Sequence, residues 1–335
     1  MDVLVFFINK VVIAGTVLGS IYALGAIGAT LIFGILRFAH FAHGDMMTMG
    51  AFFAFVIALI FYHYGIYLPV SMGFVVMPLA MILTIVVALG IDRTVYAPLR
   101  RRGARPVTLL IASIGVTLML QGLIRLFFGT GQYSFFDYGE VKSIFRIDMS
   151  WAGGARPITI TQPQLLMFIV TAVLVLVLNY FLTRTRFGKA MRAMADNADL
   201  AQVSGINTQL VVRLTWVIAA ALACAAGTML SLDVSLKPDL AFNIILPIFA
   251  AAIVGGLGQV YGAIAGGFLL GFAETLGVFN WSTILRPLAG VLPDWIVIPP
   301  DLSLVPTEYK LTVSFVILVI TLLWRPTGIF KGAST

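Results

Sequence analysis

The sequence predicts an all-α fold, a polytopic bundle of eight or nine membrane-spanning helices, on three observations. Of its 335 residues, 60% are hydrophobic and only 10% are charged, whereas a soluble domain carries roughly 25% charged residues. Several uncharged apolar runs approach or exceed the ~20 residues that a helix needs to cross the hydrocarbon core. The basic residues gather in a few loops between these runs and do not cover a folded surface.

Each span follows from an apolar run bounded by charged residues. The 46–91 run contains only His63 as a titratable group, is long enough for two spans, and predicts a turn at residues 62–65. The final run is short for a span, so it must recruit Tyr309 or let Lys310 extend its amine to the interface. Segments 37–50 and 255–258 stay open between loop, re-entrant segment and broken helix. The predicted spans are 11–36, two within 46–91, 106–124, 164–183, 214–232, one or two within 240–273, and 311–324.

Loop charge predicts the orientation, because loops rich in Lys and Arg stay on the cytoplasmic side. The 92–105 loop, the 184–213 loop and the C-terminal tail are basic, whereas the 129–163 and 278–310 loops balance both signs. We therefore expect the N-terminus outside and the C-terminus in the cytoplasm. This explains the net charge of +7 without nucleic acid as a partner. The stretches between spans are too short for a core of their own, so residues 1–335 are expected to form one membrane domain.

The most strongly patterned polar stretch is the predicted cytoplasmic loop at about 184–210. Residues 188–204 favour a helix, with Leu200 and Val203 on one face, and Gly205 is a plausible stop because glycine tolerates the left-handed conformation. Asn207 and Thr208 are suited to cap the span that follows. Two interpretations remain open, a basic helix lying on anionic lipid and a helix that docks onto another protein.

A cluster of polar residues lies in the open segment 37–50. His40 and His43 are spaced i, i+3, with Asp45 close by, which suits a metal site or a proton relay. Without further ligands the motif is weak. The favoured interpretation is that these side chains hydrogen-bond an irregular backbone near the membrane face, on or near a solute path, and no metal site is predicted.

A glycine-rich stretch follows Pro247, which is expected to interrupt a span. Gly262 and Gly266 form a GxxxG pair that permits close helix contact. Broken helices at membrane depth occur where the backbone is buried in protein or lines a cavity. The candidate residues of a translocation path are therefore Phe41, His43, Gly44, Asp45, Pro247, Gly255, Gly256 and Gly258.

Motifs that the sequence lacks restrict its function. It contains no GxxxxGK[ST], HExxH or GxSxG, and no set of carboxylates is expected at mid-membrane. Its one cysteine, Cys224, lies in an apolar run. We therefore predict no catalytic residue, no nucleotide site and no cofactor in this chain.

Three stretches, 19–51, 184–207 and 246–267, resemble the permease subunits of branched-chain amino acid ABC importers. They occur in the family's order, and the first looks more like the shorter of the two paired permeases. The 129–163 and 278–310 loops are not covered by the resemblance.

The resemblance implies a permease with several partners in the inner membrane of a bacterium or archaeon. They are a second related permease, two cytoplasmic ATPase subunits that hold ATP and Mg²⁺, an extracytoplasmic solute-binding protein, and membrane lipid. Helix 188–204 would be the coupling helix that docks onto an ATPase. Asp199, Ala201 and Gly205 fall where such loops carry an acidic residue, an alanine and a glycine. The implied coupling residues are Arg186, Gly188, Arg192, Asp196, Asn197, Asp199, Leu200, Ala201 and Gly205.

Other functions remain open. A related permease for urea or short amides would share the same motifs. From other classes, an ion-gradient-driven carrier, a passive solute channel and a membrane scaffold or sensor fit the composition. The expected lack of mid-membrane carboxylates argues against the carrier, and the patterned loop favours a docked motor.

Overall fold

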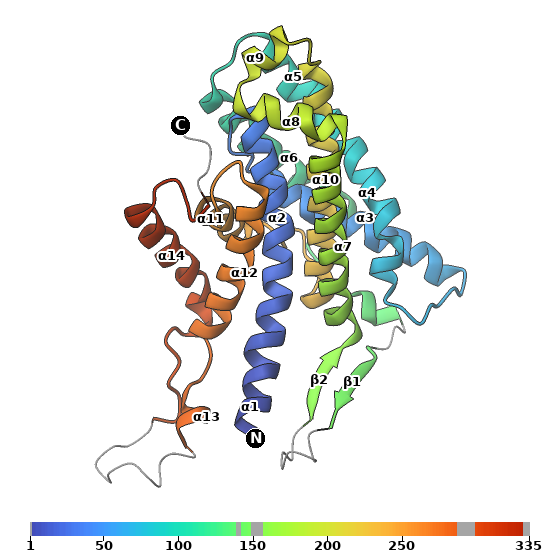
Figure 1. Ribbon diagram of the computed structural model, residues 1–335. Helices are drawn as coiled ribbons and strands as arrows, with labels where there is room; N and C mark the ends of the chain where they lie inside the picture. The colour runs from blue at the N-terminus through green and yellow to red at the C-terminus, as the bar shows by residue number, and fades with distance from the viewer. Residues whose placement is uncertain (1, 139–141, 149–156, 287–298, 331–335) are drawn as a thin grey trace.

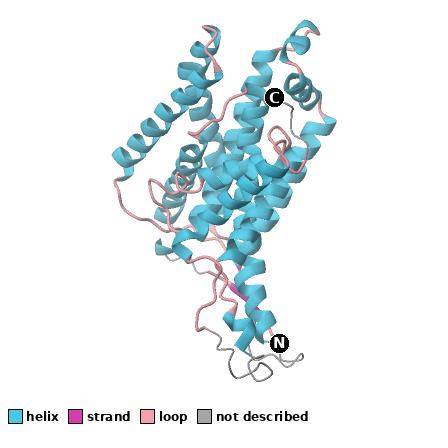
Figure 2. Cartoon of the chain, turned by 90° about the vertical axis from the view of Figure 1, so that its left-hand side faces the viewer, coloured by secondary structure: helices cyan, strands magenta, loops and turns pink. Residues whose placement is uncertain are grey.

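A computed structural model describes residues 2–138, 142–148, 157–286 and 299–330, which form a bundle of long helices (Figures 1 and 2). Among these residues, 8 helices are long and apolar enough to cross a membrane, and Ile245–Gly255 is a shorter apolar helix. The predicted bundle of eight or nine spans is confirmed. The 240–273 run contains one span and this short helix, not two full spans.

The elements follow one another along the chain with few long connections. The helices are α1 (Asp2–Phe7), the π-helical turn η1 (Ile8–Ile13), α2 (Ala14–Leu36), α3 (His43–His63), α4 (Met72–Ile91), the π-helical turn η2 (Asp92–Tyr96), α5 (Ala97–Arg101), α6 (Pro106–Phe128), the 3₁₀ turn η3 (Phe135–Tyr138), α7 (Gln162–Arg184), α8 (Arg186–Asp196), α9 (Ala198–Val203), α10 (Thr208–Asp233), α11 (Ile245–Gly255), α12 (Val260–Gly277), α13 (Ser282–Leu285), the 3₁₀ turn η6 (Thr307–Tyr309) and α14 (Lys310–Trp324). The strands are β1 (Ile144–Ile147) and β2 (Ile158–Thr161).

Helix α2 is the centre of the bundle because small residues let its neighbours come close. A Cβ added to Gly267 of α12 would lie 2.5 Å from the Cα of Ala23, and one added to Gly271 would lie 2.4 Å from the N of Gly19. Backbones can approach this closely only where both helices carry small side chains. The Ile21 side chain, in the same part of α2, is fully buried.

The periphery carries apolar side chains that face outward. Helices α4, α6, α7 and α14 expose large hydrophobic residues along one side, as expected where lipid replaces water as the surrounding solvent. Examples are Ile82, Val86, Leu118, Leu126, Leu176 and Leu323. Composition therefore identified the spans, while burial now shows which face of each span packs inward.

The two ends of the bundle differ (Figure 1). One end, here called the α8 end, carries α5, α8 and α9. The opposite end, here called the hairpin end, carries the N-terminus and the strands. Two basic segments of the sequence, 92–105 and 184–213, thus lie together at the α8 end. Of the 129–163 and 278–310 loops, residues 139–141, 149–156 and 287–298 lie outside the described residues.

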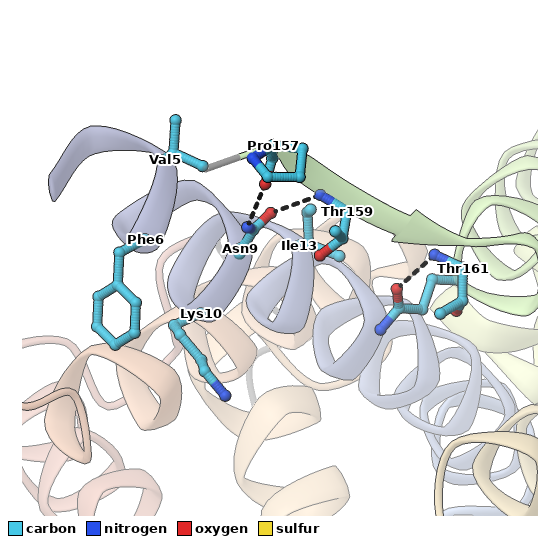
Figure 3. A pocket seen from close by; sticks show the side chains of 9 residues that line it. Val5, Phe6, Asn9, Lys10, Ile13, Pro157, Thr159 and Thr161 are labelled. Atoms are coloured by element: carbon cyan, nitrogen blue, oxygen red, sulfur yellow. Dashed lines mark hydrogen bonds between the residues drawn. The ribbon is translucent and has the colours of Figure 1, made fainter. Parts of the chain in front are cut away.

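The hairpin end projects beyond the bundle. Residues 2–36 form one run of 35 helical residues, about 52 Å long at 1.5 Å per residue, which exceeds a hydrocarbon core of ~30 Å. Strands β1 and β2 pair antiparallel and were not expected from the sequence. Asn9 fastens β2 to η1, because its amide donates to the Pro157 carbonyl at 3.3 Å and accepts from the Thr159 N–H at 3.1 Å (Figure 3). A cavity of about 410 Å³ lies beside this contact.

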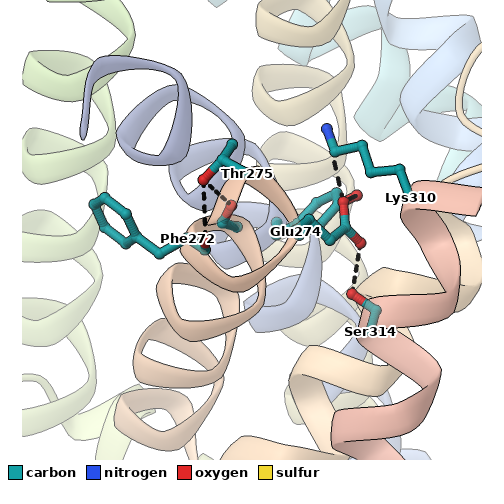
Figure 4. A network of polar contacts seen from close by, with 7 residues as sticks. Phe272, Glu274, Thr275, Lys310 and Ser314 are labelled. Carbon is teal, nitrogen blue, oxygen red and sulfur yellow. Dashed lines mark hydrogen bonds and ion pairs between the residues drawn. The ribbon is translucent and has the colours of Figure 1, made fainter. Parts of the chain in front are cut away.

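Helix α14 is held to the bundle by a buried carboxylate (Figure 4). Glu274 of α12 is 0% exposed, and its carboxylate accepts from Tyr22 Oη at 2.9 Å and from Ser314 Oγ at 2.5 Å. The Lys310 amine lies 3.8 Å away. The fold therefore buries Glu274 between α2, α12 and α14.

Candidate functional site

The segment that joins α2 to α3 turns back into the bundle. Helix α2 ends at Arg37, which has a left-handed φ of 57°. The first residue of α3, His43, has its Nε2 3.1 Å from the Gly25 carbonyl oxygen, and a Cβ on Gly28 would lie 2.6 Å from its Cε1. These glycines lie about 12–16 Å before the end of α2 at 1.5 Å per residue. Helix α3 therefore begins deep in the bundle, not near the membrane face as the sequence suggested.

Helix α11 also begins inside the bundle, but the chain enters it from the hairpin end. The segment that leads to it starts at the hairpin end, where Leu236 and Tyr133 exchange backbone hydrogen bonds. Pro247 lies in the first turn of α11, where proline is tolerated because the N–H groups there have no intrahelical partner. The prediction that Pro247 interrupts a span is wrong, since it lies where a short helix starts.

The starts of these two helices meet in the interior. A Cβ on Gly44 would lie 3.0 Å from the Ala241 carbonyl oxygen, and the Ala241 N–H donates to Thr48 Oγ1 at 3.1 Å. The rings of Phe41 and Phe249 lie 5.2 Å apart. Helix N-termini present unpaired N–H groups and a positive dipole, and discontinuous helices surround solute sites in many transporters. We call this contact the mid-bundle junction.

The three remaining candidate path residues lie elsewhere. Gly255 ends α11 at the α8 end, and Gly256 and Gly258 have φ of 112° and 85° in the turn that leads to α12. The C-terminal segment packs on this turn, since the N–H of Phe330 donates to the Gly255 carbonyl at 3.2 Å. A Cβ on Gly255 would lie 2.0 Å from the Gly262 oxygen. The fold therefore separates these glycines from the mid-bundle junction, and their role is a turn and close packing.

Polar groups without partners surround the start of α3. Both ring nitrogens of His40 and both carboxylate oxygens of Asp45 lack a hydrogen bond among the described residues, although each side chain is 1% exposed. Buried polar groups are rarely left unpaired, and ionisable groups inside a membrane bundle usually mark function. The sequence predicted no set of carboxylates at mid-membrane, and the fold buries a single one, Asp45, at the start of α3. Among the described residues, no three potential metal ligands come together.

Two polar neighbours of Asp45 were not among the predicted site residues. Thr117 and Gln121 of α6 face its carboxylate, and both are buried. Together with Ser113, whose Oγ accepts from the Phe41 N–H at 3.2 Å, they follow one another every four residues. That spacing places them on one face of α6. The same polar spacing is visible in the sequence of the 106–124 span and could have identified these residues.

The loop at the α8 end folds into two helices, not the single helix predicted over 188–204. Asn197 leaves the helical conformation at φ −151°, and its side chain accepts from the Leu200 N–H at 2.9 Å, which caps α9. This capping competes with continuation of α8. The end at Gly205 is confirmed by its φ of 83°, and Asn207 caps α10 by accepting from the Leu210 N–H at 3.1 Å.

The predicted coupling residues divide into an inner and an outer set. Gly188 and Ala201 are buried against the spans, and the Arg37 guanidinium donates to the Ala195 carbonyl, which ties α8 to α2. On α9, Leu200 is 64% exposed and the nearby Val203 87%. The exposed members of the predicted set are Arg186, Arg192, Asp196, Asn197, Asp199, Leu200 and Gly205.

Comparison with known proteins identifies the family. The family described as "Branched-chain amino acid transport system / permease component" matches residues 11–322. The branched-chain amino acid permease LivH of Escherichia coli (strain K12) is 34% identical over 94% of this chain and 92% of its own length. BraD of Pseudomonas aeruginosa is 31% identical over 94% and 93%, and a probable LivH of Methanocaldococcus jannaschii 29% over 96% and 92%. No solved structure matches.

These matches cover nearly the whole chain. The relatives are permease proteins of high-affinity branched-chain amino acid transport systems, and so transport components and not enzymes. Together with the apolar helices, this makes the chain a multi-pass membrane protein whose role is transport. The chain belongs to the family of permease components of branched-chain amino acid transport systems.

Proposed function

We propose that this chain is the permease subunit of an ATP-driven importer for branched-chain amino acids, coupled through α8 and α9 to a partner ATPase. The single observation that carries the coupling is the exposed apolar surface of α9. Leu200 and Val203 project from α9, whose Ala201 is buried, and α8 before it is hydrogen-bonded to Arg37 after α2; exposed apolar patches rimmed by charge usually mark protein interfaces. The proposed substrate is that of the relatives LivH and BraD, which are permeases for branched-chain amino acids.

The orientation proposed for the chain places the α8 end in the cytoplasm. The basic segments 92–105 and 184–213 gather there (Figure 1), and such segments stay on the cytoplasmic side. The N-terminus would then lie outside the inner membrane of a bacterium or archaeon. A soluble binding protein would deliver solute at the hairpin end, and the ATPases, which hold ATP and Mg²⁺, would bind at the α8 end.

The mid-bundle junction is proposed as part of the solute path. Phe41, His43, Gly44 and Asp45 lie there beside the start of α11, so that two helix N-termini and one carboxylate are available to a zwitterionic solute. ATP-driven movement of α8 and α9 would rock the spans to open this junction to one side and then to the other. A second, related permease would complete the path.

Two variants of the loop test the coupling. Gly205→Pro removes a residue with a left-handed φ and deletes the N–H that donates to the Gln202 carbonyl at 3.0 Å. Asp199→Lys reverses an exposed charge in the first turn of α9. Both should insert normally and abolish uptake and capture of the ATPase subunit. As a control, Asp137→Lys reverses an exposed charge at the hairpin end and should keep ATPase capture. Normal uptake by both loop variants would refute the coupling role.

The substrate and energy source need a separate experiment. The assembled complex, reconstituted with its binding protein, should take up leucine only when ATP is present on the ATPase side, with or without an ionophore. Uptake that needs an ion gradient would instead identify a secondary carrier, and uptake without any energy source would identify a channel. Uptake of urea or a short amide in place of leucine would keep the permease and change its solute.

A further inference from the structure

A cavity of about 270 Å³ lies at the α8 end, between α2, α7, α8 and the start of α12. Helix α8 covers it, so the same helix contributes to the proposed coupling loop and to the wall of this cavity. Its size approaches the lower end of small-molecule sites. The cavity is separate from the mid-bundle junction, since none of the junction residues lines it.

The cavity presents one charge of each sign. Arg192 and Asp196 both line it from α8, and their i, i+4 spacing places them on one face of the helix. Neither side chain belongs to an ion pair formed within the described residues. A site with a guanidinium and a carboxylate that do not neutralise one another suits a ligand that carries both a carboxylate and an ammonium group.

A buried hydroxyl also lines the cavity without a partner. Thr30 is 1% exposed, and its Oγ1 makes no hydrogen bond to the described part of the chain. Several other buried threonines of the bundle donate to the carbonyl four residues earlier, as Thr84 does to Ala80 at 2.8 Å and Thr215 to Val211 at 2.9 Å. A buried polar group without a partner is unfavourable, so Thr30 offers a hydrogen bond to a ligand.

The rest of the lining is largely apolar. Ile35 of α2, Val175 and Leu182 of α7, and Ile264 of α12 contribute to it. The combination of an apolar wall with a few polar groups is typical of sites for small organic ligands. A branched aliphatic side chain would contact this wall while the charged groups of the ligand reach α8.

We propose that this cavity is an inhibitory site that binds the transported amino acid from the cytoplasmic side. Arg192 would bind the carboxylate, Asp196 the ammonium group, and Thr30 would donate a hydrogen bond. A bound molecule would fasten α8 to α2 and α7 and so oppose the movement that couples ATP hydrolysis to transport. Amino acid that has accumulated in the cytoplasm would then slow further import. This inference rests on the proposed function.

The test uses the complete complex in proteoliposomes, with the binding protein outside and ATP inside. Initial uptake of labelled leucine is compared between vesicles loaded with unlabelled leucine and empty ones. Wild-type uptake should fall about fivefold in loaded vesicles. Leucinol, which lacks the carboxylate, and 4-methylvalerate, which lacks the ammonium group, should not inhibit. Rates in loaded vesicles equal to those in empty ones would overturn the inference, whereas no uptake in empty vesicles would overturn the proposed function.

Variants locate the inhibition in the cavity. Arg192→Gln and Asp196→Asn should each raise the half-inhibiting leucine concentration about tenfold, which corresponds to about 1.4 kcal/mol. Because both residues also belong to the proposed coupling loop, Val175→Phe provides a second test that fills the cavity from α7 and should abolish the inhibition. Val177→Phe is the matched control, since Val177 is 61% exposed on the same helix and is absent from the lining; it should keep the inhibition.

Direct binding distinguishes the amino acid from membrane lipid. Detergent-solubilised complex without binding protein should bind labelled leucine saturably, and Val175→Phe should lose this binding. A zwitterionic phospholipid could present the same two charges. Native mass spectrometry that shows a retained phospholipid in wild type and none in Val175→Phe, with leucine failing to bind, would overturn the inference.

Discussion

Replacement of Gly227 by alanine tests the packing that places the start of α3 inside the bundle. Gly227 lies where α10 crosses α3, and a Cβ there would lie 1.9 Å from the carbonyl oxygen of Met47 and 2.9 Å from its Cα. The nearest atoms belong to backbone, so no side chain can rotate away. Helix α3 must therefore move as a unit, and with it Gly44 and the mid-bundle junction.

The magnitude follows from two opposing effects. Ordinary contacts begin near 3.4 Å, so the helices must separate by about 1.5 Å, and overpacking of this kind typically costs about 1–3 kcal/mol. Alanine is a better helix former than glycine by about 1 kcal/mol, which offsets part of the loss. Because the clash is with backbone atoms, its cost belongs to the upper part of that range, about 2–3 kcal/mol, and the net destabilisation expected for Gly227→Ala is about 1–2 kcal/mol.

Thermal unfolding of the solubilised complex, followed by size-exclusion chromatography, measures this effect. The melting temperature of Gly227→Ala should fall by about 2–6 °C, and leucine uptake should fall because the junction shifts. Gly122→Ala on α6 is the matched control, since nothing lies within 4 Å of a Cβ there; it should melt at or above the wild-type temperature. If both variants melt alike, the crossing of α3 and α10 is not as close as described.

Two further substitutions test other contacts. Gly188→Ala would place a Cβ 2.3 Å from the Phe181 carbonyl oxygen, so we expect α8 to shift and ATPase stimulation in the reconstituted complex to fall; full stimulation would refute the role of this close approach. Glu274→Leu would leave the Tyr22 and Ser314 hydroxyls without an acceptor and destabilise the attachment of α14 by about 2–4 kcal/mol. Hydrogen exchange in α14 should then rise, whereas unchanged protection would show that its packing is sufficient.

The loop at about 184–210 shows which features local sequence patterns can predict and which they cannot. Gly205 and Asn207 were identified correctly because a left-handed φ and a side-chain cap are local requirements that few residue types satisfy. The same chemistry at Asn197 was overlooked, since asparagine within an alanine-rich stretch also occurs inside helices. Its side chain competes with the backbone of α8, and only the three-dimensional path shows that the cap prevails.

The spans could likewise be predicted from the sequence, whereas the mid-bundle junction could not. Side chains that face lipid must be apolar, and backbone groups in lipid must all be hydrogen-bonded within the protein. Hydropathy by itself therefore determined the helical bundle and the span positions, and loop charge determined the basic segments. Only the tertiary structure decided how deep each segment lies in the bundle and which distant segments touch. The glycines of α2, α3 and α10 allow backbones to touch, and this close packing draws the starts of α3 and α11 inward and buries Asp45 and Glu274. No linear pattern encodes such contacts, because they depend on which faces of distant helices fit together.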